Sequence, residues 1–416
     1  MSKPKNNVAL QHLLHKALAY FNEEQYTEAN AIYNQLIHQY PTEPVIFYSQ
    51  GCLYQRTNAL EKAEIAFKKA LTLNPTMTQA YNNLGNTLRD QGRYKESQVY
   101  LEKAIALDPQ YARAHLNLGI TLLTQGELPQ GWREYEWRHQ VYNTHPNFSQ
   151  PLWEGQSHPT ESLLISAEQG IGDTLQFIRY LPEVKKHFQY VFLQVQLPLW
   201  HLLASNKITH GVLASGQGRP AFHRHITLPS LPALFKTTLD TIPPPYPLAA
   251  PTHPIPLEIE TIGKKPRIGF IWRGNPNHPN DHNRSLPLHY FIELARHSHA
   301  VFYSLQRENN EDLAQWPKNL PLYDLHPYMV DFAATAALIN HMDIIISADT
   351  AMAHLAGSLG KPVITLLPYV PDWRWLTKGH TTPWYPSMTL LRQAAPQQWA
   401  PVFAQLKERI PRMLSA

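Results

Sequence analysis

Cysteine is almost absent from this sequence. Cys52 is the one cysteine in 416 residues, so a disulfide framework is impossible and a cysteine-based metal site is not expected. The first 25 residues lack the apolar core of a secretory signal. No stretch approaches the roughly 18 consecutive apolar residues that a membrane helix needs. We therefore expect a cytoplasmic protein with no transmembrane segment.

Charged residues are also sparse. They make up 16% of the chain, against 43% hydrophobic residues, and this balance is typical of a globular protein. The net charge is +4 with the 22 histidines counted as neutral, and Lys and Arg form no dense run. This scattered distribution argues against nucleic-acid binding and is compatible with anionic small molecules. The length is sufficient for two or three domains.

A period of 34 residues runs through the first third of the chain. Such a period, with small residues where helices meet, is typical of tetratricopeptide repeats. The glycines allow a second helix to approach closely, bulky residues fill the groove, and the prolines end the second helix. We predict a tetratricopeptide solenoid over residues 1–145, with about four repeats, the last of which loses its pattern after Trp132. The columns at this spacing are Pro41, Pro75 and Pro109; Gly51, Gly85 and Gly119; Tyr33, Phe67 and Leu101; and Ala29, Ala63 and Ser97.

Four asparagines occupy the predicted first helices of repeats three and four: Asn82, Asn83, Asn86 and Asn117. Arrays of this kind build a concave surface for a peptide or protein. Asparagine amides can hold the backbone of an extended peptide through paired hydrogen bonds. The alternative is that these amides are solvated or tie neighbouring helices together.

Short apolar runs alternate with helical patterns after residue 160. The alternation indicates two lobes, 151–240 and 267–416, each with a parallel sheet of doubly wound type. Residues 241–266 join them as a stiff linker, in which eight of 26 residues are proline. The final segment is predicted to be helical up to Pro411. Ligands of such folds bind at the carboxyl ends of strands, and a cleft between two lobes is the default site. The predicted strands are 162–167, 190–195, 210–215, 267–274, 300–306, 342–347 and 361–368.

In each lobe, one polar loop follows the first predicted strand. Residues 168–173 contain two glycines, which permit close approach of a ligand, and end at Asp173, which is also placed to cap a helix. Residues 272–287 carry Arg273 and Arg284, whose guanidinium groups suit a diphosphate. The alternative is that these arginines lie on the surface of a flexible loop. His278 and His282 are separated by Pro279, which argues against a helical metal pair, and we predict no metal site.

A third loop, residues 347–357, joins a strand to a helix that starts near Asp349 or Thr350. The free N–H groups of Thr350 and Ala351 there form an anion site. His354 lies about one turn into the helix, on the face of Thr350, within reach of the same ligand. The alternative is a capped core helix with His354 satisfied inside.

Several motifs, in order, resemble those of the tetratricopeptide-linked glycosyltransferases of the bacterial heptosyltransferase-like family. They are AEQGIGDTLQFIRYLP, IWRGNPNHPNDHNRSLPL, SADTAMAHLAGSLGKPVITLLPYVPDWRW and PWYP. The plan is also similar to that of protein O-GlcNAc transferases, which join such repeats to a GT-B region. The resemblance implies an α-solenoid followed by a two-lobed, GT-B-like pair of Rossmann-type α/β lobes. It further implies that Asp173 is the general base and that Asp349, Thr350 and His354 bind the nucleotide sugar. Arg284 would contact the donor phosphate or sugar, at a place where heptosyltransferases often have Lys.

The resulting hypothesis is a metal-independent glycosyltransferase, whose nucleotide-sugar donor is a co-substrate and which needs no separate cofactor. The acceptor would be a hydroxyl group of a protein or peptide held by the repeats. Two other hypotheses stay open: a non-catalytic adaptor with a nucleotide-binding scaffold, and an epimerase of related two-lobed design. The predicted donor-binding residues are Arg273, Asn275, Arg284, Gln306, Arg307, Asp349, Thr350, Ala351 and His354, and those for the acceptor or peptide are Gln169, Asn82, Asn83, Asn86 and Asn117.

Overall fold

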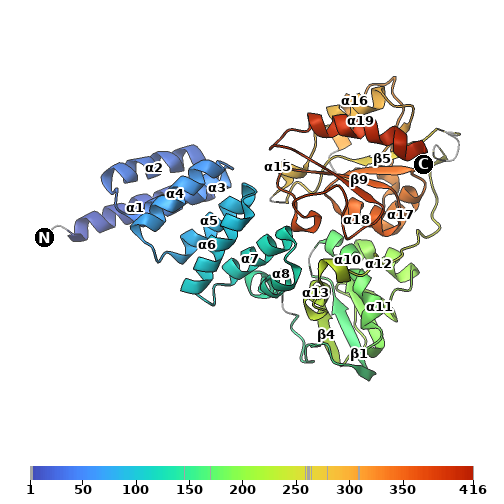
Figure 1. Ribbon diagram of the computed structural model, residues 1–416, viewed down its shortest axis with the longest axis horizontal. Coiled ribbons are helices and arrows are strands. Elements are labelled where there is room, and N and C mark those ends of the chain that lie inside the picture. The colour runs from blue at the N-terminus through green and yellow to red at the C-terminus, as the bar shows by residue number, and fades with distance from the viewer. Residues whose placement is uncertain are drawn as a thin grey trace. The chain divides into compact units, whose positions relative to one another are not determined.

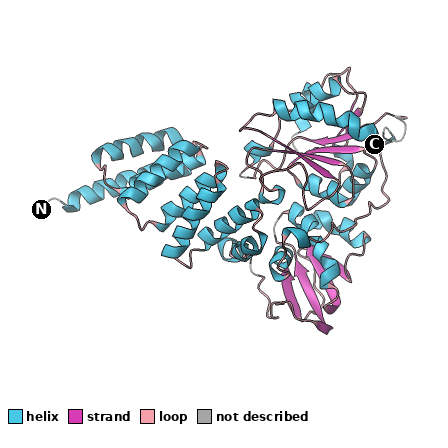
Figure 2. Cartoon of the chain, in the orientation of Figure 1, coloured by secondary structure: helices cyan, strands magenta, loops and turns pink. Residues whose placement is uncertain are grey.

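The structure is a computed structural model that describes residues 3–144, 146–168, 170–257, 259, 263, 265–278, 280–307 and 310–415. Gln169, predicted to bind the acceptor, and Pro279 lie outside the described residues. The chain divides into two compact units, Met1–His145 and Pro146–Ala416. All the strands, drawn in magenta in Figure 2, belong to the second unit.

Paired antiparallel helices make up the described part of the first unit (Figure 1). The first helices of pairs two to four begin at residues 44, 78 and 112, and the second helices of all four pairs begin at 26, 60, 94 and 128. Each step is 34 residues, so the predicted tetratricopeptide array is confirmed. The helices are α1 (Lys3–Asn22), α2 (Tyr26–Gln39), α3 (Pro44–Arg56), α4 (Leu60–Leu73), α5 (Thr78–Asp90), α6 (Tyr94–Leu107), α7 (Ala112–Gln125), α8 (Leu128–Tyr135) and α9 (Arg138–Tyr142).

The three periodic glycines lie where the helices of a pair touch. A Cβ atom on Gly51 would stand 2.6 Å from the Phe67 ring, and one on Gly85 would stand 2.6 Å from Leu101 Cγ. On Gly119 it would stand 2.6 Å from the backbone nitrogen of Tyr135. The fourth pair therefore packs backbone against backbone, which explains why its sequence departs from the pattern of the others.

The array ends on a short turn of helix instead of a further pair. The imidazole of His115 stacks on the Trp137 ring with 4.0 Å between centroids, and its Nδ1 lies 2.6 Å from Glu134 Oε2. The buried guanidinium of Arg138 donates to Glu136 at 2.5 Å. The contacts of His115 join α7 to Glu134 of α8 and to Trp137, the residue before α9, whereas the Arg138–Glu136 bond is local to the last turn.

The first lobe of the second unit is a four-stranded parallel sheet in the order β3-β2-β1-β4. Its strands are β1 (His158–Ser166), β2 (Phe188–Val195), β3 (Gly211–Ala214) and β4 (Arg224–Thr227). The sequence analysis missed β4, because its four residues begin with Arg and His and show no apolar run. The helices of this lobe are α10 (Ile171–Phe177), α11 (Leu181–Val184), α12 (Leu197–Ser205) and α13 (Leu231–Leu234).

The second lobe is a six-stranded parallel sheet in the order β10-β9-β8-β5-β6-β7. The strands are β5 (Arg267–Ile271), β6 (Val301–Ser304), β7 (Leu322–Asp324), β8 (Ile344–Ala348), β9 (Val363–Leu367) and β10 (Met388–Arg392). From β5 the chain continues to β6 and β7 on one side of the sheet, and from β8 it continues to β9 and β10 on the other side. The end of these two strands is thus the topological switch point, where open α/β sheets bind ligands. The sequence analysis missed β7 and β10.

The helices of this lobe are α15 (Asp281–Arg284), α16 (His289–Arg296), α17 (Phe332–Asn340), α18 (Ala351–Ser358) and α19 (Ala400–Ser415). Helix α19 continues through Pro411, so the prediction that the helix ends there is wrong. A proline so near the C-terminal end of a helix removes only one N–H donor from the last turns. Val402, Phe403 and Leu406 of α19 are buried in the core of the second lobe.

The proline-rich segment after the first lobe is held in place at two points. The side-chain amide of Asn206 donates to the Ala249 carbonyl at 2.9 Å and accepts from the Ala249 N–H at 2.7 Å. The guanidinium of Arg179 donates to the Pro243 carbonyl at 3.1 Å. The segment therefore follows the surface of the first lobe and has its own buried residue, Leu248.

The contact at Gly119 leads to a stability prediction. We expect Gly119→Ala to destabilise the chain by about 1 to 3 kcal/mol, because backbone cannot yield to the new methyl group. Gly51→Ala should cost less, since the Phe67 ring can tilt away from the new methyl group. Thermal unfolding of the full chain measures both. Gly218→Ala is the control, because no atom lies within 4 Å of its added Cβ. Equal losses for Gly119→Ala and Gly51→Ala would contradict this account.

Candidate functional site

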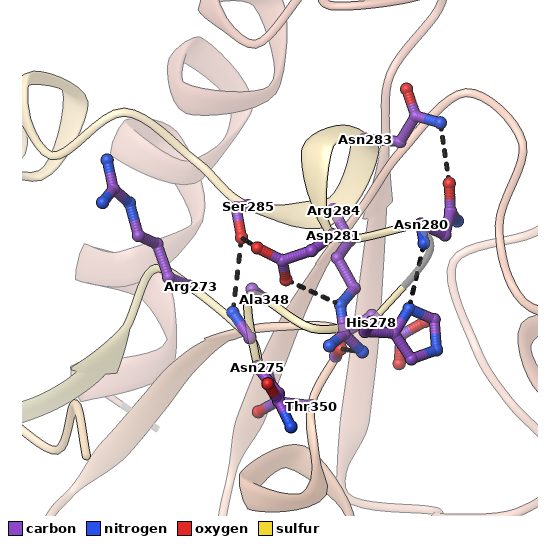
Figure 3. A network of polar contacts seen from close by, with 12 residues as sticks. Arg273, Asn275, His278, Asn280, Asp281, Asn283, Arg284, Ser285, Ala348 and Thr350 are labelled. Atoms are coloured by element: carbon purple, nitrogen blue, oxygen red, sulfur yellow. Dashed lines mark hydrogen bonds and ion pairs between the residues drawn. The ribbon is translucent and has the colours of Figure 1, made fainter. Parts of the chain in front are cut away.

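Arg284 lies at the switch point of the second sheet: it belongs to the loop that follows β5 and reaches the turn that follows β8 (Figure 3). Its Nη1 donates to the backbone carbonyl of Asp349 at 3.1 Å, and its Nε donates to Asp281 Oδ1 at 3.1 Å. A Cβ on Gly274 would come within 2.3 Å of the guanidinium, so glycine is needed there to make room. Arg284 thus joins the two loops that the sequence analysis assigned to the donor.

The loop around Arg284 is folded by its own polar contacts. Ser285 Oγ donates to Asp281 Oδ2 at 2.9 Å and accepts from the Gly274 N–H at 3.3 Å. Asn283 donates to Asn280 Oδ1 at 2.7 Å. The side chain of Arg284 is only 14% exposed. Arg284 therefore belongs to an ordered polar network and not to a flexible surface loop.

Two other predicted residues of this region, Arg273 and Gln306, make polar contacts that do not involve Arg284. The guanidinium of Arg273 extends away from it in Figure 3 and pairs with Asp312 at 2.9 Å. Gln306 is buried and holds the backbone of Arg273, accepting from its N–H at 3.1 Å and donating to its carbonyl at 3.2 Å. Arg307 and Asn275 are exposed. In this structure Gln306 supports the loop.

Helix α18 begins where the sequence predicted. Thr350 is its N-cap residue, and its Oγ1 accepts from the Met352 N–H at 3.3 Å and lies 3.2 Å from Ser347 Oγ. Ala351 is the first residue of the helix. The N–H groups of this first turn carry the positive end of the helix dipole. The region can therefore accept negative charge.

His354 is buried one turn into α18. Its Nδ1 lies 3.0 Å from the Tyr385 hydroxyl, and its ring stacks on Trp375 with 5.2 Å between centroids. Burial, together with the positive charges of Arg374 and Arg179, holds the pKa of His354 well below its ordinary value. The imidazole is consequently neutral at neutral pH, and it offers a hydrogen bond without a charge.

Asp349 carries an unusual carboxyl group. Burial, and next the neighbouring carboxylate of Asp372, raise the pKa of Asp349 to about 6, against the opposing effect of Arg284 and Arg374. A carboxyl group in this range changes its protonation state near neutral pH. Such perturbed groups concentrate at functional sites.

Asp173 reaches the same region from the first lobe. Its Oδ2 accepts from the Gly170 N–H at 2.9 Å, so it caps α10 as the sequence allowed. Its Oδ1 accepts a hydrogen bond from Nη2 of Arg374, a residue of the second lobe. A Cβ on Gly172 would lie 3.0 Å from His354 Cδ2. The first turn of α10 therefore packs directly on α18.

Sequence reasoning gave no role to three residues that the structure places here, namely Arg374, Gln176 and Tyr385. Arg374 and Tyr385 belong to the PDWRW and PWYP motifs, which served only for the resemblance. Gln176 had a signal of its own. Asp173, Gln176 and Arg179 recur at a spacing of three along a predicted helix, and polar residues at that spacing mark one face.

The asparagines of the first unit bond mainly to neighbouring helices. Asn117 of α7 donates to Asn82 Oδ1 at 2.8 Å, and Asn82 donates to Asn83 Oδ1 at 3.0 Å. Asn83 donates to the Tyr48 hydroxyl of α3 at 3.3 Å. The hydrogen bonds of Asn82, Asn83 and Asn117 therefore agree with the alternative, in which the amides tie neighbouring helices together. Asn86 differs, since its buried Oδ1 accepts no hydrogen bond from the described residues.

Neither a metal cluster nor a membrane span is present in the part of the chain that the structure describes. No three His, Cys, Asp or Glu side chains there are grouped to hold a metal ion. No helix among the same residues is long and apolar enough to cross a membrane.

Comparison with protein families finds matches within both units of the chain. Tetratricopeptide models match residues 13–42, 45–77, 66–99 and 85–126. The model of glycosyltransferase family 9 (heptosyltransferase) matches residues 287–404. The chain joins tetratricopeptide repeats to a family 9 glycosyltransferase domain. The resemblance drawn from the sequence motifs is confirmed, and the matched family 9 region includes Asp349, His354 and Arg374.

Among curated proteins, FlbA of Caulobacter vibrioides is 22% identical over 307 residues, which are 67% of this chain and 51% of FlbA. The chain thus spans about half the length of that relative. Among solved structures, a mutant of the Thermobaculum terrenum O-GlcNAc transferase has 13% identity and a TM-score of 0.36, covering 100% of this chain and 94% of the other. The structure of MamA has 19% identity and a TM-score of 0.30, covering 32% and 78%.

The raised pKa of Asp349 predicts a pH-dependent effect on stability. In the folded chain this carboxyl keeps its proton up to about pH 6, whereas in the unfolded chain it loses it near pH 4. Stability is therefore lost as the pH rises from 4 to 6 and stays reduced above 6. We expect Asp349→Asn to stabilise the chain by about 1 to 3 kcal/mol at pH 7.5.

Only about a third of this gain should remain at pH 4.5, where the folded wild-type carboxyl is protonated and the penalty is only partly developed. Thermal unfolding at the two pH values measures the difference. The exposed residue Asp240 provides the control variant Asp240→Asn. An equal gain at both pH values would contradict the raised pKa.

Proposed function

We propose that this chain transfers a sugar from a nucleotide-sugar donor to a hydroxyl group of a protein or peptide, and that the repeats hold this acceptor. The family 9 domain supports glycosyl transfer itself. The observation that carries the proposal further is the position of Arg284, hydrogen-bonded at 3.1 Å to the Asp349 carbonyl beside the first turn of α18.

The donor diphosphate would lie against Arg284 and the free N–H groups of α18. A guanidinium binds phosphate oxygens in pairs, and a helix N-terminus favours negative charge. As the bond between the anomeric carbon and the diphosphate breaks, charge collects on the departing oxygen, and both groups stabilise it. They would thereby take the part that a divalent cation plays in metal-dependent transferases. Neutral His354 adds hydrogen bonding without further charge.

The remaining roles follow from the two carboxyl groups. Asp349 would accept hydrogen bonds from donor hydroxyls, and we expect donor binding to weaken as this group becomes protonated below about pH 6. Asp173, from the opposite lobe, would take the proton of the acceptor hydroxyl while its oxygen attacks the anomeric carbon. The products are the glycosylated acceptor and a nucleoside diphosphate, so no separate cofactor is required.

A division of labour between the lobes is testable with two variants. A panel of labelled nucleotide sugars first identifies the donor, through binding and through turnover to acceptors or water. Asp173→Asn should then lower kcat by about 100-fold or more, because a general base contributes at least that factor, while the donor Kd stays within about threefold. Arg284→Gln should weaken donor binding by about tenfold or more, since charged hydrogen bonds contribute about 1.5–3 kcal/mol.

Arg296→Gln is the matched control, because Arg296 is 56% exposed and pairs only weakly, at 3.3 Å, with Glu293. Full turnover by Asp173→Asn would show that Asp173 is not the general base. Tight donor binding by the wild type, with no transfer or hydrolysis for any donor, would favour the adaptor hypothesis instead.

The role of the repeats is tested by removing them. Residues 146–416 form a compact unit, so we expect this fragment to retain donor hydrolysis within a few-fold of the full chain. Transfer of labelled sugar to protein should fall at least tenfold, because the acceptor loses its tether and the effective concentration that the tether provides. Adding residues 1–145 as a separate chain should not restore it. Unchanged protein labelling by the fragment would show that the repeats do not present the acceptor.

A further inference from the structure

We propose that Arg374 is the positioning residue for Asp173: a guanidinium of the second lobe holds the carboxylate of the first lobe beside α18. The inference rests on the proposed function and assigns a residue to which neither the sequence motifs nor the family match gives a role. It explains how a base from one lobe is fixed at a donor site in the other.

The guanidinium of Arg374 donates hydrogen bonds to residues of both lobes. Nη2 donates to Asp173 Oδ1, and Nε donates to Gln176 Oε1 at 2.7 Å; both acceptors belong to α10. Nη1 donates to Asp372 Oδ1 at 2.7 Å within the second lobe. The guanidinium also lies over the Trp373 ring, 4.3 Å from its centroid. A planar group bound in this manner on three sides has one orientation, and it imposes that orientation on the carboxylate.

Because this arrangement is buried, it is selective for arginine at position 374. The side chains of Asp173 and Arg374 are each only 12% exposed, and Gln176 is fully buried. In such surroundings hydrogen bonds to charged groups are stronger than in water, and removing one partner is costly. Lysine keeps the charge of arginine but cannot match three acceptors in one plane. The geometry therefore favours arginine over lysine.

Gln176 connects Arg374 to a second arginine. Its backbone carbonyl accepts from Arg179 Nε at 2.6 Å, and Arg179 Nη1 donates to the Trp384 carbonyl of the second lobe at 2.9 Å. Arg179 also lies 5.1 Å from the ring centroids of Trp384 and Tyr385. Tyr385 is the partner of His354. One connected set of contacts thus runs from Asp173 to the helix proposed to hold the donor.

The test is a double-mutant cycle in the full chain with the donor found active in the panel. Arg374→Gln should lower kcat by about 10- to 100-fold, because misplacing a reacting group by about 1 Å costs this much. The donor Kd should change by less than about threefold. Arg374→Lys should recover part of the lost kcat. Arg296→Gln remains the exposed control.

The cycle separates positioning from a merely structural effect. In the Asp173→Asn background, Arg374→Gln should lower kcat by less than about threefold further, since the carboxylate that it orients is gone. A structural role would instead lower kcat by the same factor in both backgrounds, and this result would overturn the inference. If Arg374→Gln does not fold, Gln176→Met provides the same cycle, because it removes one acceptor of Arg374 without changing any charge.

The failure of the proposed function would look different. A wild-type chain that binds a donor but transfers and hydrolyses none would remove the base and its positioning residue together. An active wild type whose Arg374→Gln variant keeps its kcat would remove the positioning role alone.

Discussion

The second unit depends on arginine side chains that cross from one lobe to the other. Arg179 extends from the first lobe to a carbonyl of the second, and Arg374 extends in the opposite direction to α10. A third contact, between His201 of α12 and Asp331 at the start of α17, joins the lobes at 2.6 Å. Because the partners are carbonyls, amides and carboxylates at fixed angles, these contacts set orientation as well as distance. The contact of Arg374 also fixes Asp173 relative to the second lobe.

The same arginines contribute to the unusual electrostatics at the switch point. Burial, and next the charges of Arg374 and Arg179, lower the pKa of His354, whereas burial, and next the carboxylate of Asp372, raise the pKa of Asp349. The imidazole of His354 is thus neutral at neutral pH, whereas the carboxyl group of Asp349 is largely ionised above about pH 6. Positive charge is provided by Arg284 and the first turn of α18. On the proposed function, this positive charge would face the donor diphosphate.

The parts of the fold that repeat were predictable from the sequence, since the spacing of Gly51, Gly85 and Gly119 follows directly from helix packing. Several strands were predictable from their continuous apolar runs, because strands of a parallel sheet are buried on both faces. Strands β4 and β7 were not, because they are short and polar and form only by pairing with strands distant in sequence. For the site, the sequence indicated the three loops, and the fold brings Asp173, Arg284, Asp349 and His354 to one region.

What the sequence could not reveal is which partner each polar side chain selects. Arg273 and Arg284 occupy the same loop and have the same chemistry, yet one pairs with Asp312 and the other bonds to the Asp349 carbonyl. The choice depends on β6 and β8, which lie on opposite sides of β5. Arg374 was overlooked for a similar reason, since its partner Asp173 precedes it by some 200 residues.

The bonded asparagines of the first unit affect how a peptide could be recognised there. Asn82, Asn83 and Asn117 already satisfy one another and Tyr48. A peptide backbone that engaged them would exchange existing hydrogen bonds for new ones, with little net gain. Discrimination among peptides would then come from shape and apolar contact, and many sequences of suitable form would bind with modest, similar affinity. On the proposed function, a transferase supplied by such an array would modify a class of proteins and not a single one.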